Sequence, residues 1–231
     1  MQRWMGWFAG WMLPLRCRIC AQPGGNGLDL CLACHAAAVP NLWACRMCAM
    51  PLATPDTELC GGCQTQPGSL QGCHAGWRYG PTLDALVRRY KFEQDLAAGA
   101  VLAGLMRQRP PPWLTKDCVL MPVPLHRQRL AQRGYDQAGE LARLLARDTG
   151  LTVATGGLHR QRATAAQSGL ARAQRTRNLR NAFSVLAGSF AGSVVLVDDV
   201  MTTGATLEAA AQALRRNGIT RVRAWVAART V

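Results

Sequence analysis

Two adjacent carboxylates, Asp198 and Asp199, are the residues best placed to do chemistry, because of what surrounds them. The four apolar residues before them, 194–197, predict a short strand that is buried on both faces. After them come a small polar loop, Thr202–Thr206, and then a segment with helical spacing that ends near Asn217. A strand, a loop and a helix in this order predict an anion site, because the amides of the loop and of the first helical turn lack backbone partners.

The loop and the two acids together predict a pocket for a sugar phosphate. Gly204 removes the side chain that would block close approach of a phosphate, and the loop contains neither lysine nor arginine. Carboxylates repel phosphate, but they accept hydrogen bonds from ribose hydroxyls and can support a metal ion. The candidate binding residues are Asp198, Asp199, Thr202, Thr203, Gly204, Ala205 and Thr206. The two acids are also the catalytic candidates.

Three interpretations of this segment compete. In the first, the acids only cap the turn that follows a strand. In the second, they belong to a P-loop nucleotidase, but the two lysines, Lys91 and Lys116, do not follow the glycine-rich loop that this class requires. In the third, the segment is a phosphoribosyl pyrophosphate (PRPP) motif. It resembles the motif of type I phosphoribosyltransferases at every position, with an apolar run, two acids and Thr-Gly-x-Thr. We favour the third.

Eight of the ten cysteines form four Cys-x-x-Cys pairs, which predict metal binding. The pairs are Cys17/Cys20, Cys31/Cys34, Cys45/Cys48 and Cys60/Cys63. Two thiolates on one tight turn can hold one side of a zinc tetrahedron, and a second turn completes it. Four pairs therefore predict two structural Zn²⁺ sites, which would supply much of the stability of a segment with few large apolar residues.

The alternative for these cysteines is a disulfide scaffold, which requires an exported chain. We expect no secretory signal, because only Arg3 precedes the apolar start and no Ala-x-Ala pattern lies before Cys17. Sequential pairing of the turns is the simplest arrangement, and cross-braced pairing of the first with the third turn stays open. His35 and Cys73 are expected to be bystanders, since the ligand count is already complete.

The net charge of +14 is concentrated outside the cysteine-rich part. Residues 1–72 contain four basic and three acidic residues, and the rest contains 23 basic and ten acidic residues. Such an excess suits an anionic substrate, nucleic acid or a membrane surface, although 25 arginines against two lysines also fit a compositional bias. No apolar run is long enough to predict a transmembrane segment. Residues 1–14 place three tryptophans on one helical face, which could contact a partner or a membrane surface.

Strand and helix patterns alternate through the larger part of the chain and predict a parallel, doubly wound α/β domain. Strands are expected at about 77–79, 119–123, 194–197 and 222–227, and helices at about 81–90, 97–107, 138–148 and 205–217. We expect an apolar N-terminal segment over residues 1–16, a double zinc-ribbon module over 17–73 and a phosphoribosyltransferase-like domain over 74–231.

Basic residues outside the acid motif are candidates for holding a pyrophosphate. Arginines crowd residues 159–181, which lack an apolar stripe and are expected to form a flap over an anionic substrate. A second candidate is the loop after the strand at 119–123, because ligands bind at the carboxyl ends of parallel strands. The candidate residues are Lys91, Leu125, His126, Arg127, Arg133, Arg162 and Arg175.

From Cys17 to the C-terminus, the chain resembles the ComF (ComF/GntX) family. The resemblance rests on the Cys-x-x-Cys pairs, Tyr-Lys-Phe, Met-Pro-Val-Pro, Arg-Gly-Tyr-Asp-Gln-Ala, the arginines with Gln167 and Asn178, and Val-Asp-Asp-Val-Met-Thr-Thr-Gly-Ala-Thr. One departure is Asp136, where the family pattern implies asparagine after Arg-Gly-aromatic, and an extra carboxylate beside an anion pocket is unfavourable for an anionic ligand of that loop.

The resemblance implies a type I phosphoribosyltransferase fold, PRPP binding with Mg²⁺ and a role in competence, DNA uptake and handling of incoming single-stranded DNA. It implies that Asp198 and Asp199 hold the ribose hydroxyls and that Thr202–Thr206 hold the 5′-phosphate. We expect a cytoplasmic phosphoribosyltransferase, at the inner face of the membrane if residues 1–14 dock there, with single-stranded DNA or a DNA-uptake helicase as partners. The alternative is a non-catalytic DNA-binding or docking accessory that retains PRPP binding.

Overall fold

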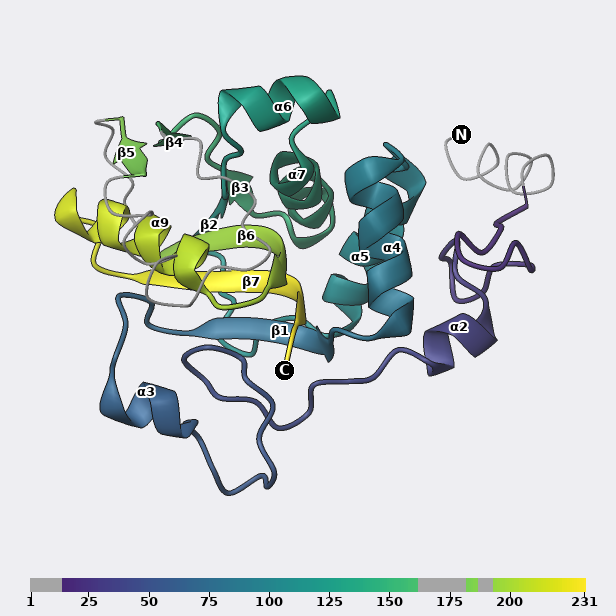
Figure 1. Ribbon diagram of the computed structural model, residues 1–231, viewed down its shortest axis with the longest axis horizontal. Helices are drawn as coiled ribbons and strands as arrows, with labels where there is room; N and C mark the ends of the chain where they lie inside the picture. Colours follow the sequence, from purple (N-terminus) through teal and green to yellow (C-terminus); the bar gives the residue numbers. More distant parts are fainter. Residues whose placement is uncertain (1–13, 162–181, 187–192) are drawn as a thin grey trace.

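A five-stranded parallel sheet lies at the centre of the molecule in the computed structural model, which describes residues 14–161, 182–186 and 193–231 (Figure 1). Its strand order is β1-β7-β6-β2-β3, and every neighbouring pair is parallel. The strands are β1 (Cys73–Arg78), β2 (Cys118–Pro122), β3 (Thr152–Val153), β6 (Ser193–Met201) and β7 (Val222–Arg229). The predicted parallel α/β architecture is therefore confirmed.

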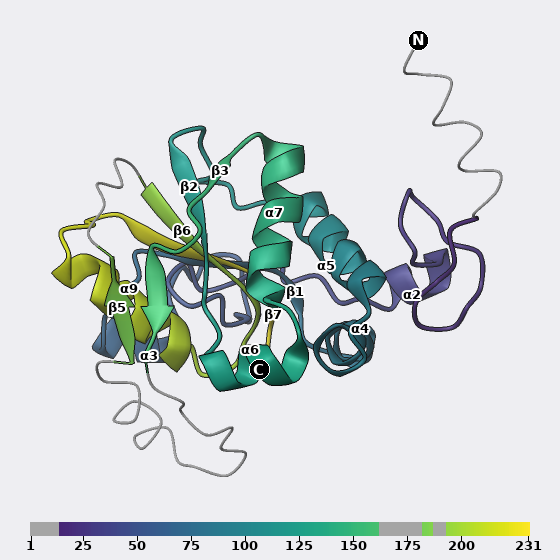
Figure 2. The same cartoon turned by 90° about the horizontal axis from the view of Figure 1, so that it is seen from above.

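Helices cover both faces of this sheet (Figure 2). Helices α4 (Pro81–Phe92), α5 (Leu96–Gln108) and α7 (Gln137–Thr149) pack on one face, and α9 (Ala205–Arg216) packs on the other. Three shorter helices are α2 (Leu32–Ala36), α3 (Gly61–Thr65) and α6 (Arg127–Arg133). Within the described ranges, no helix has the length and apolar character needed to cross a bilayer.

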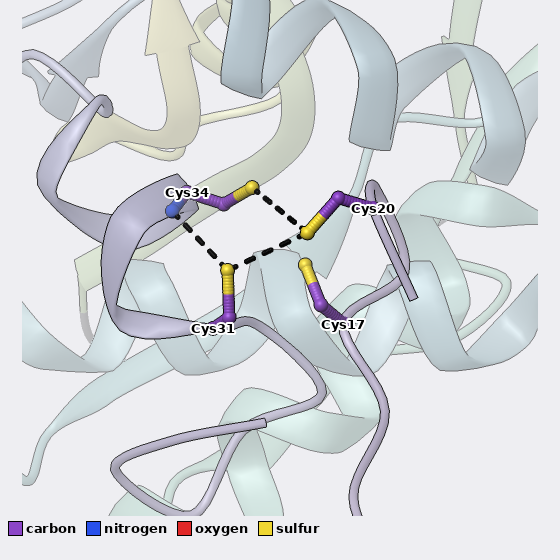
Figure 3. Close-up of side chains that lie close together, drawn as sticks. All are labelled: Cys17, Cys20, Cys31 and Cys34. Atoms are coloured by element: carbon purple, nitrogen blue, oxygen red, sulfur yellow. Dashed lines mark hydrogen bonds between the residues drawn. The ribbon is translucent and has the colours of Figure 1, made fainter. Parts of the chain in front are cut away.

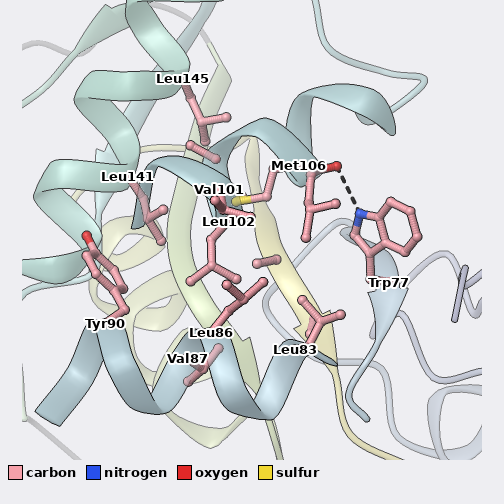
Figure 4. Close-up of a cluster of buried hydrophobic side chains, with 14 of the residues drawn as sticks. Trp77, Leu83, Leu86, Val87, Tyr90, Val101, Leu102, Met106, Leu141 and Leu145 are labelled. Atoms are coloured by element: carbon pink, nitrogen blue, oxygen red, sulfur yellow. Dashed lines mark hydrogen bonds between the residues drawn. The ribbon is translucent and has the colours of Figure 1, made fainter. Parts of the chain in front are cut away.

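The side chains of β6 alternate between two hydrophobic cores, because successive residues of a strand point to opposite faces. Val195 and Val197 join the larger core with α4, α5 and α7, part of which is drawn in Figure 4. Val194 and Leu196 join the smaller core with α9. All four side chains are fully buried, so the apolar run predicted to be buried on both faces lies at the centre of the molecule.

The structure differs from the predicted elements in several places, and β1 begins at Cys73 instead of residue 77. β6 continues beyond residue 197 to Met201, because Asp198, Val200 and Met201 pair with residues of β7. Helix α6 lies where no helix is predicted, since its seven residues include only two apolar side chains and show no stripe. Strands β4 (Leu158–Arg160) and β5 (Phe183–Val185) form an antiparallel hairpin. The predicted flap over residues 159–181 thus begins in β4, and its part from 162 to 181 lies outside the described residues.

The two cysteine-rich segments pack against different cores. Leu28 and Leu30 of the first segment join the core of α4, α5 and α7, and the Arg18 guanidinium lies 2.7 Å from an Asp95 carboxylate oxygen. Ala49 and Leu70 of the second segment join the core beside α9. The helices of these segments, α2 and α3, accordingly lie far apart in Figure 1. Strand β1 begins at Cys73, at the end of the cysteine-rich part, and the domain boundaries stay a prediction.

A tight contact between α4 and α5 yields the first testable prediction. A Cβ added at Gly99 would lie 2.8 Å from Tyr90 Cδ2 and nearer still to Cε2. The Tyr90 ring is fully buried, and its hydroxyl donates to the carbonyl of Gln137 at 2.7 Å, so it has no room to move. We expect Gly99→Ala to lower the free energy of unfolding by about 1–3 kcal/mol in urea titrations.

The matched control is Gly62→Ala in helix α3, where no atom lies within 4 Å of the added Cβ. Alanine favours helix over glycine, so this variant should be neutral or stabilised by about 0.5–1 kcal/mol. Equal stability of Gly99→Ala and the wild-type protein would contradict the close approach of α4 and α5.

Candidate functional site

Asp198 and Asp199 line a cavity of about 440 Å³ at the carboxyl end of β6. The Asp199 side chain is buried, and one of its oxygens lies 2.8 Å from the Lys91 ammonium. Its oxygen also accepts a hydrogen bond from the Val200 amide at 2.6 Å, and Asp198 accepts one from the Asp199 amide at 2.9 Å. Asp199 is therefore packed against a basic side chain, yet both acids face a cleft in which a ligand has room.

The proximity of the two acids changes the proton affinity of Asp198. Burial raises the pKa of the Asp198 carboxyl to about 7, and the charge of Asp199 adds to this effect. The Lys91 ammonium opposes it by favouring the charged form. A ligand that brings hydroxyl donors or a divalent cation to this end of β6 would remove the repulsion, and the donor set of carboxylate oxygens fits Mg²⁺.

The predicted phosphate loop lies between two cavities. Thr202 and Thr206 line the cavity that contains the acids. Thr203, Gly204 and Ala205 line a second cavity of about 400 Å³ on the side of the second cysteine segment. Gly204 precedes helix α9 with a φ of +78°, a left-handed conformation in which a larger residue would be strained. The structure thus brings the loop and the acids together and leaves the phosphate role of the loop a prediction.

Basic side chains also line the acid cavity. They come from three elements and comprise Arg88 and Lys91 of α4, Arg129 and Arg133 of α6, and Arg160 of β4. Five cations against two acids make this cavity suitable for a ligand with several phosphates. Phe92 lies at the same cavity with 73% of its surface exposed, and the Arg133 guanidinium lies 5.8 Å from its ring centroid.

The candidate pyrophosphate residues divide between neighbouring cavities. Lys91, Leu125 and Arg133 line the acid cavity. Leu125 also borders a larger cavity of about 910 Å³, where His126 and Arg127 lie. Arg162 and Arg175 lie outside the described residues.

Arg88 and Arg129 also line the acid cavity but are not among the candidate residues from the sequence, and Arg160 is predicted only as part of the arginine-rich flap. Arg129 and Arg133 are four residues apart, which places them on one face of a helix. That spacing is the signal that could have identified Arg129.

Asp136, the departure from the family pattern, does not line the acid cavity. It is the N-terminal cap residue of α7 and borders the neighbouring cavity that contains His126 and Arg127. Burial raises the pKa of its carboxyl above the usual range. The carboxylate therefore does not lie where it would face a phosphate bound by the cations of the acid cavity.

The eight paired cysteines form two four-sulfur clusters. One consists of Cys17, Cys20, Cys31 and Cys34, shown in Figure 3, and the other consists of Cys45, Cys48, Cys60 and Cys63. Within each cluster the four sulfur atoms lie within 4.8 Å of one another, as a tetrahedral zinc site requires. The pairing is sequential, as the simplest arrangement predicts, and the cross-braced alternative is wrong.

The two clusters share one backbone design. In each, the first Cys-x-x-Cys turn places an alanine, Ala21 or Ala49, in the left-handed region with φ near +60°. The third cysteine, Cys31 or Cys60, is the N-terminal cap of a short helix. Burial alone would raise the pKa of Cys17, but backbone hydrogen bonds, first that of Cys31, lower it to about 6. These thiols are held as ligands for Zn²⁺, whereas Cys73 is buried in the core beside α9.

Comparison with known domain families agrees with both parts of this description. Residues 130–230 match the phosphoribosyl transferase domain, and residues 8–64 match the double zinc ribbon domain. The first match includes β6, β7 and the two acids, and the two four-sulfur clusters lie within the second. The chain is thus a protein of the phosphoribosyltransferase fold that carries a double zinc ribbon.

Its relatives include proteins named for DNA utilization and a protein named for competence. The chain is 33% identical over 225 residues to the DNA utilization protein YhgH of Salmonella typhimurium, which covers 95% of this chain and 99% of that protein. It is 32% identical over 225 residues to the protein of the same name from Escherichia coli K12. The competence protein F of Haemophilus influenzae is 32% identical over 178 residues, 74% of this chain and 78% of that protein. The chain belongs to the ComF family.

The raised pKa of Asp198 predicts how stability depends on pH. Because folding raises this pKa from 3.8 to about 7, the native state retains a proton that the unfolded state releases between these values. The contribution of Asp198 to stability is therefore fully present below pH 4 and is lost as the pH rises towards 7. Asp198→Asn removes this loss. We expect its melting temperature to exceed that of the wild-type protein by several degrees at pH 8, but not at pH 4.

The exposed Asp56 provides the control for this experiment, since Asp56→Asn makes the same chemical change outside the cleft. Its melting temperature should follow the wild-type value at both pH values. A gain for Asp198→Asn that is the same at pH 4 and pH 8 would show that the carboxyl is not held in its neutral form.

Proposed function

We propose that this protein binds PRPP with Mg²⁺ in the acid cavity and transfers its phosphoribosyl group to an acceptor. The observation that carries the proposal is the cavity of about 440 Å³, which is lined by two acids, two loop threonines and five basic side chains. A sugar with phosphates at both ends needs hydrogen-bond acceptors for its hydroxyls and cations or hydroxyl donors for its phosphates. The match to the phosphoribosyl transferase domain supports the same ligand class.

In this proposal, the acids, the loop and the basic side chains of the cavity each bind a different part of the ligand. Asp198 and Asp199 accept hydrogen bonds from the ribose hydroxyls and support the Mg²⁺ that accompanies the pyrophosphate. Residues Thr202–Thr206 hold the 5′-phosphate through their amides and hydroxyls at the N-terminus of α9. The basic side chains of the cavity bind the pyrophosphate. Among them, Lys91 and Arg133 are the residues that the sequence predicts for this role.

The ion pair between Lys91 and Asp199 must exchange partners when such a ligand binds. Without ligand, the ammonium neutralises a buried carboxylate at 2.8 Å. When PRPP with Mg²⁺ enters, Asp199 turns to the hydroxyls and the cation, and Lys91 turns to the pyrophosphate oxygens. Each charge then keeps an opposite partner, so the exchange leaves neither group buried and unpaired.

The proposed reaction is a displacement at C1 of the ribose. The bond from C1 to the pyrophosphate oxygen breaks, a nitrogen of the acceptor forms a bond to C1, and the acceptor releases a proton. Positive charge develops on the ribose ring in an oxocarbenium-like transition state, as in other glycosyl transfers. Asp198 and Asp199 stabilise that charge, and the basic side chains stabilise the departing pyrophosphate.

The names of the relatives suggest where this chemistry is used. Two are called DNA utilization proteins and one a competence protein, which supports a role in handling incoming single-stranded DNA in the cytoplasm. In this proposal, partners include single-stranded DNA and components of the uptake machinery such as a helicase. Residues 1–14 would provide contact with the inner face of the membrane; residues 1–13 lie outside the described part.

The alternative is a non-catalytic protein that binds single-stranded DNA and retains PRPP as a regulator. The observation that favours it is the exposed ring of Phe92, which lines the acid cavity with the Arg133 guanidinium 5.8 Å from its centroid. Aromatic rings beside cations stack nucleobases without requiring a particular sequence. The two functions differ in whether pyrophosphate is released and in whether affinity for single-stranded DNA falls steeply with salt.

Calorimetry with PRPP and Mg²⁺ tests the ligand assignment. Asp199→Asn removes the charge that faces the ribose and the cation, so we expect affinity to fall by about 10-fold or more and turnover to be lost. The fold should persist, because asparagine has nearly the same shape. Asp56→Asn is the control and should bind like the wild-type protein. Full binding and full transfer by Asp199→Asn would overturn the assignment.

A screen for pyrophosphate release separates the enzyme from the accessory protein. With PRPP, Mg²⁺ and the correct acceptor base, the enzyme should release one pyrophosphate for each nucleotide formed. The accessory should release none, and its affinity for single-stranded DNA should fall steeply with salt and in Phe92→Ala. Pyrophosphate release that Asp199→Asn abolishes would reject the accessory.

A further inference from the structure

Arg229 at the end of β7 is a buried cation with an unusual set of partners. Only 5% of its surface is exposed, and no carboxylate of the described residues lies within salt-bridge distance of it. Its guanidinium donates instead to main-chain carbonyls and to one hydroxyl. An arginine placed in this way must be neutralised by something other than an acidic side chain.

The carbonyls that Arg229 contacts belong to two functional segments. Its Nε donates to the carbonyl of Cys48 at 3.0 Å, in the turn that holds the second zinc cluster. Its Nη1 donates to the carbonyl of Met201 at 3.1 Å and to that of Thr202, where the phosphate loop begins. One rigid guanidinium therefore links a zinc-binding turn to the loop that precedes α9.

Other contacts bring the same two segments together. The Cys73 thiol lies 3.4 Å from the Met201 sulfur, and Glu208 of α9 accepts from the Ser69 amide at 2.6 Å. The cavity of about 400 Å³ between them is lined by Cys48 and Cys63 on one side and by residues 203–205 on the other. The second zinc ribbon thus supports the side of the phosphate loop that faces away from the acids.

Charge explains why Arg229 is tolerated at this place. A divalent zinc ion held by four thiolates leaves a net charge of about −2 on the cluster. Arg229 contacts the backbone of one ligand residue of that cluster and so lies close to its negative charge. Among the described contacts, the arginine beside the first cluster does not link that cluster to the phosphate loop. This arginine is Arg18, and its guanidinium lies 2.7 Å from an Asp95 carboxylate oxygen.

We propose that Arg229 is a positioning residue through which the second zinc ribbon, and not the first, holds the phosphate loop in its binding conformation. The two ribbons have the same design, but they differ in what they support: the first packs on the core of α4, α5 and α7, and the second packs on the loop. The part of the proposal that concerns ligand affinity rests on the proposed function. The part that concerns loop order does not.

Two matched cysteine variants test the difference between the ribbons. Cys34→Ser and Cys63→Ser each remove the fourth ligand of one cluster, and both residues are half-buried. Amide hydrogen exchange at Glu208 and Thr230, whose amides donate to the carbonyls of Gly204 and Met201 in the loop, reports the order of the loop when it is measured with the full chain below its melting temperature. We expect exchange there to rise about 10-fold in Cys63→Ser and less than about 2-fold in Cys34→Ser. Equal exchange in both variants would overturn the proposal.

Arg229→Lys tests the link itself, because lysine keeps the charge but cannot donate to Cys48 and Met201 with one planar group. We expect this variant to retain two zinc ions per chain and unchanged exchange in α7, while exchange at the Glu208 and Thr230 amides and the dissociation constant for PRPP with Mg²⁺ each rise about 10-fold. Unchanged loop exchange would contradict the link.

Wild-type protein that does not bind PRPP would refute the proposed function. The exchange measurements would still decide whether Arg229 couples the second ribbon to the loop.

Discussion

Two carboxylates placed side by side at the end of a buried strand repel each other, and the arrangement of the cleft follows from that repulsion. β6 pairs with β7 as far as Met201, which fixes both acids at the same edge of the sheet. Lys91 neutralises Asp199, while the pKa of Asp198 rises to about 7 through burial and its neighbour's charge. The ligand-free cleft is therefore prepared for a partner that supplies hydroxyl donors or a cation.

The zinc ribbons are integrated into the domain instead of forming a separate head. Each contributes buried residues to a different core, so the sheet lies between them and both bear on its stability. The second ribbon also borders the loop that follows the acids. Structural metal sites at this position can influence ligand binding without contacting the ligand, since they set the position of backbone groups that do.

Much of this arrangement could be predicted from residue patterns. The run at 194–197 gave the central strand, because buried parallel strands are continuously apolar, and the Cys-x-x-Cys spacing gave both clusters. Helix α6 could not be predicted because it lacks an apolar stripe, and for that reason Arg129, which lies on it, was not predicted either. The buried role of Arg229 could not be predicted either, because its partners are carbonyls of residues 28 and 181 positions away in the chain. Contacts of that kind depend on tertiary structure alone.

The most direct measurement is a crystal structure of the protein with PRPP and Mg²⁺. The assignment predicts ribose hydroxyl oxygens within about 3 Å of the carboxylates of Asp198 and Asp199, with the 5′-phosphate at residues 202–206. Lys91 should then have left Asp199 for the pyrophosphate. A ligand bound elsewhere, with the ion pair between Lys91 and Asp199 intact, would contradict the central claim.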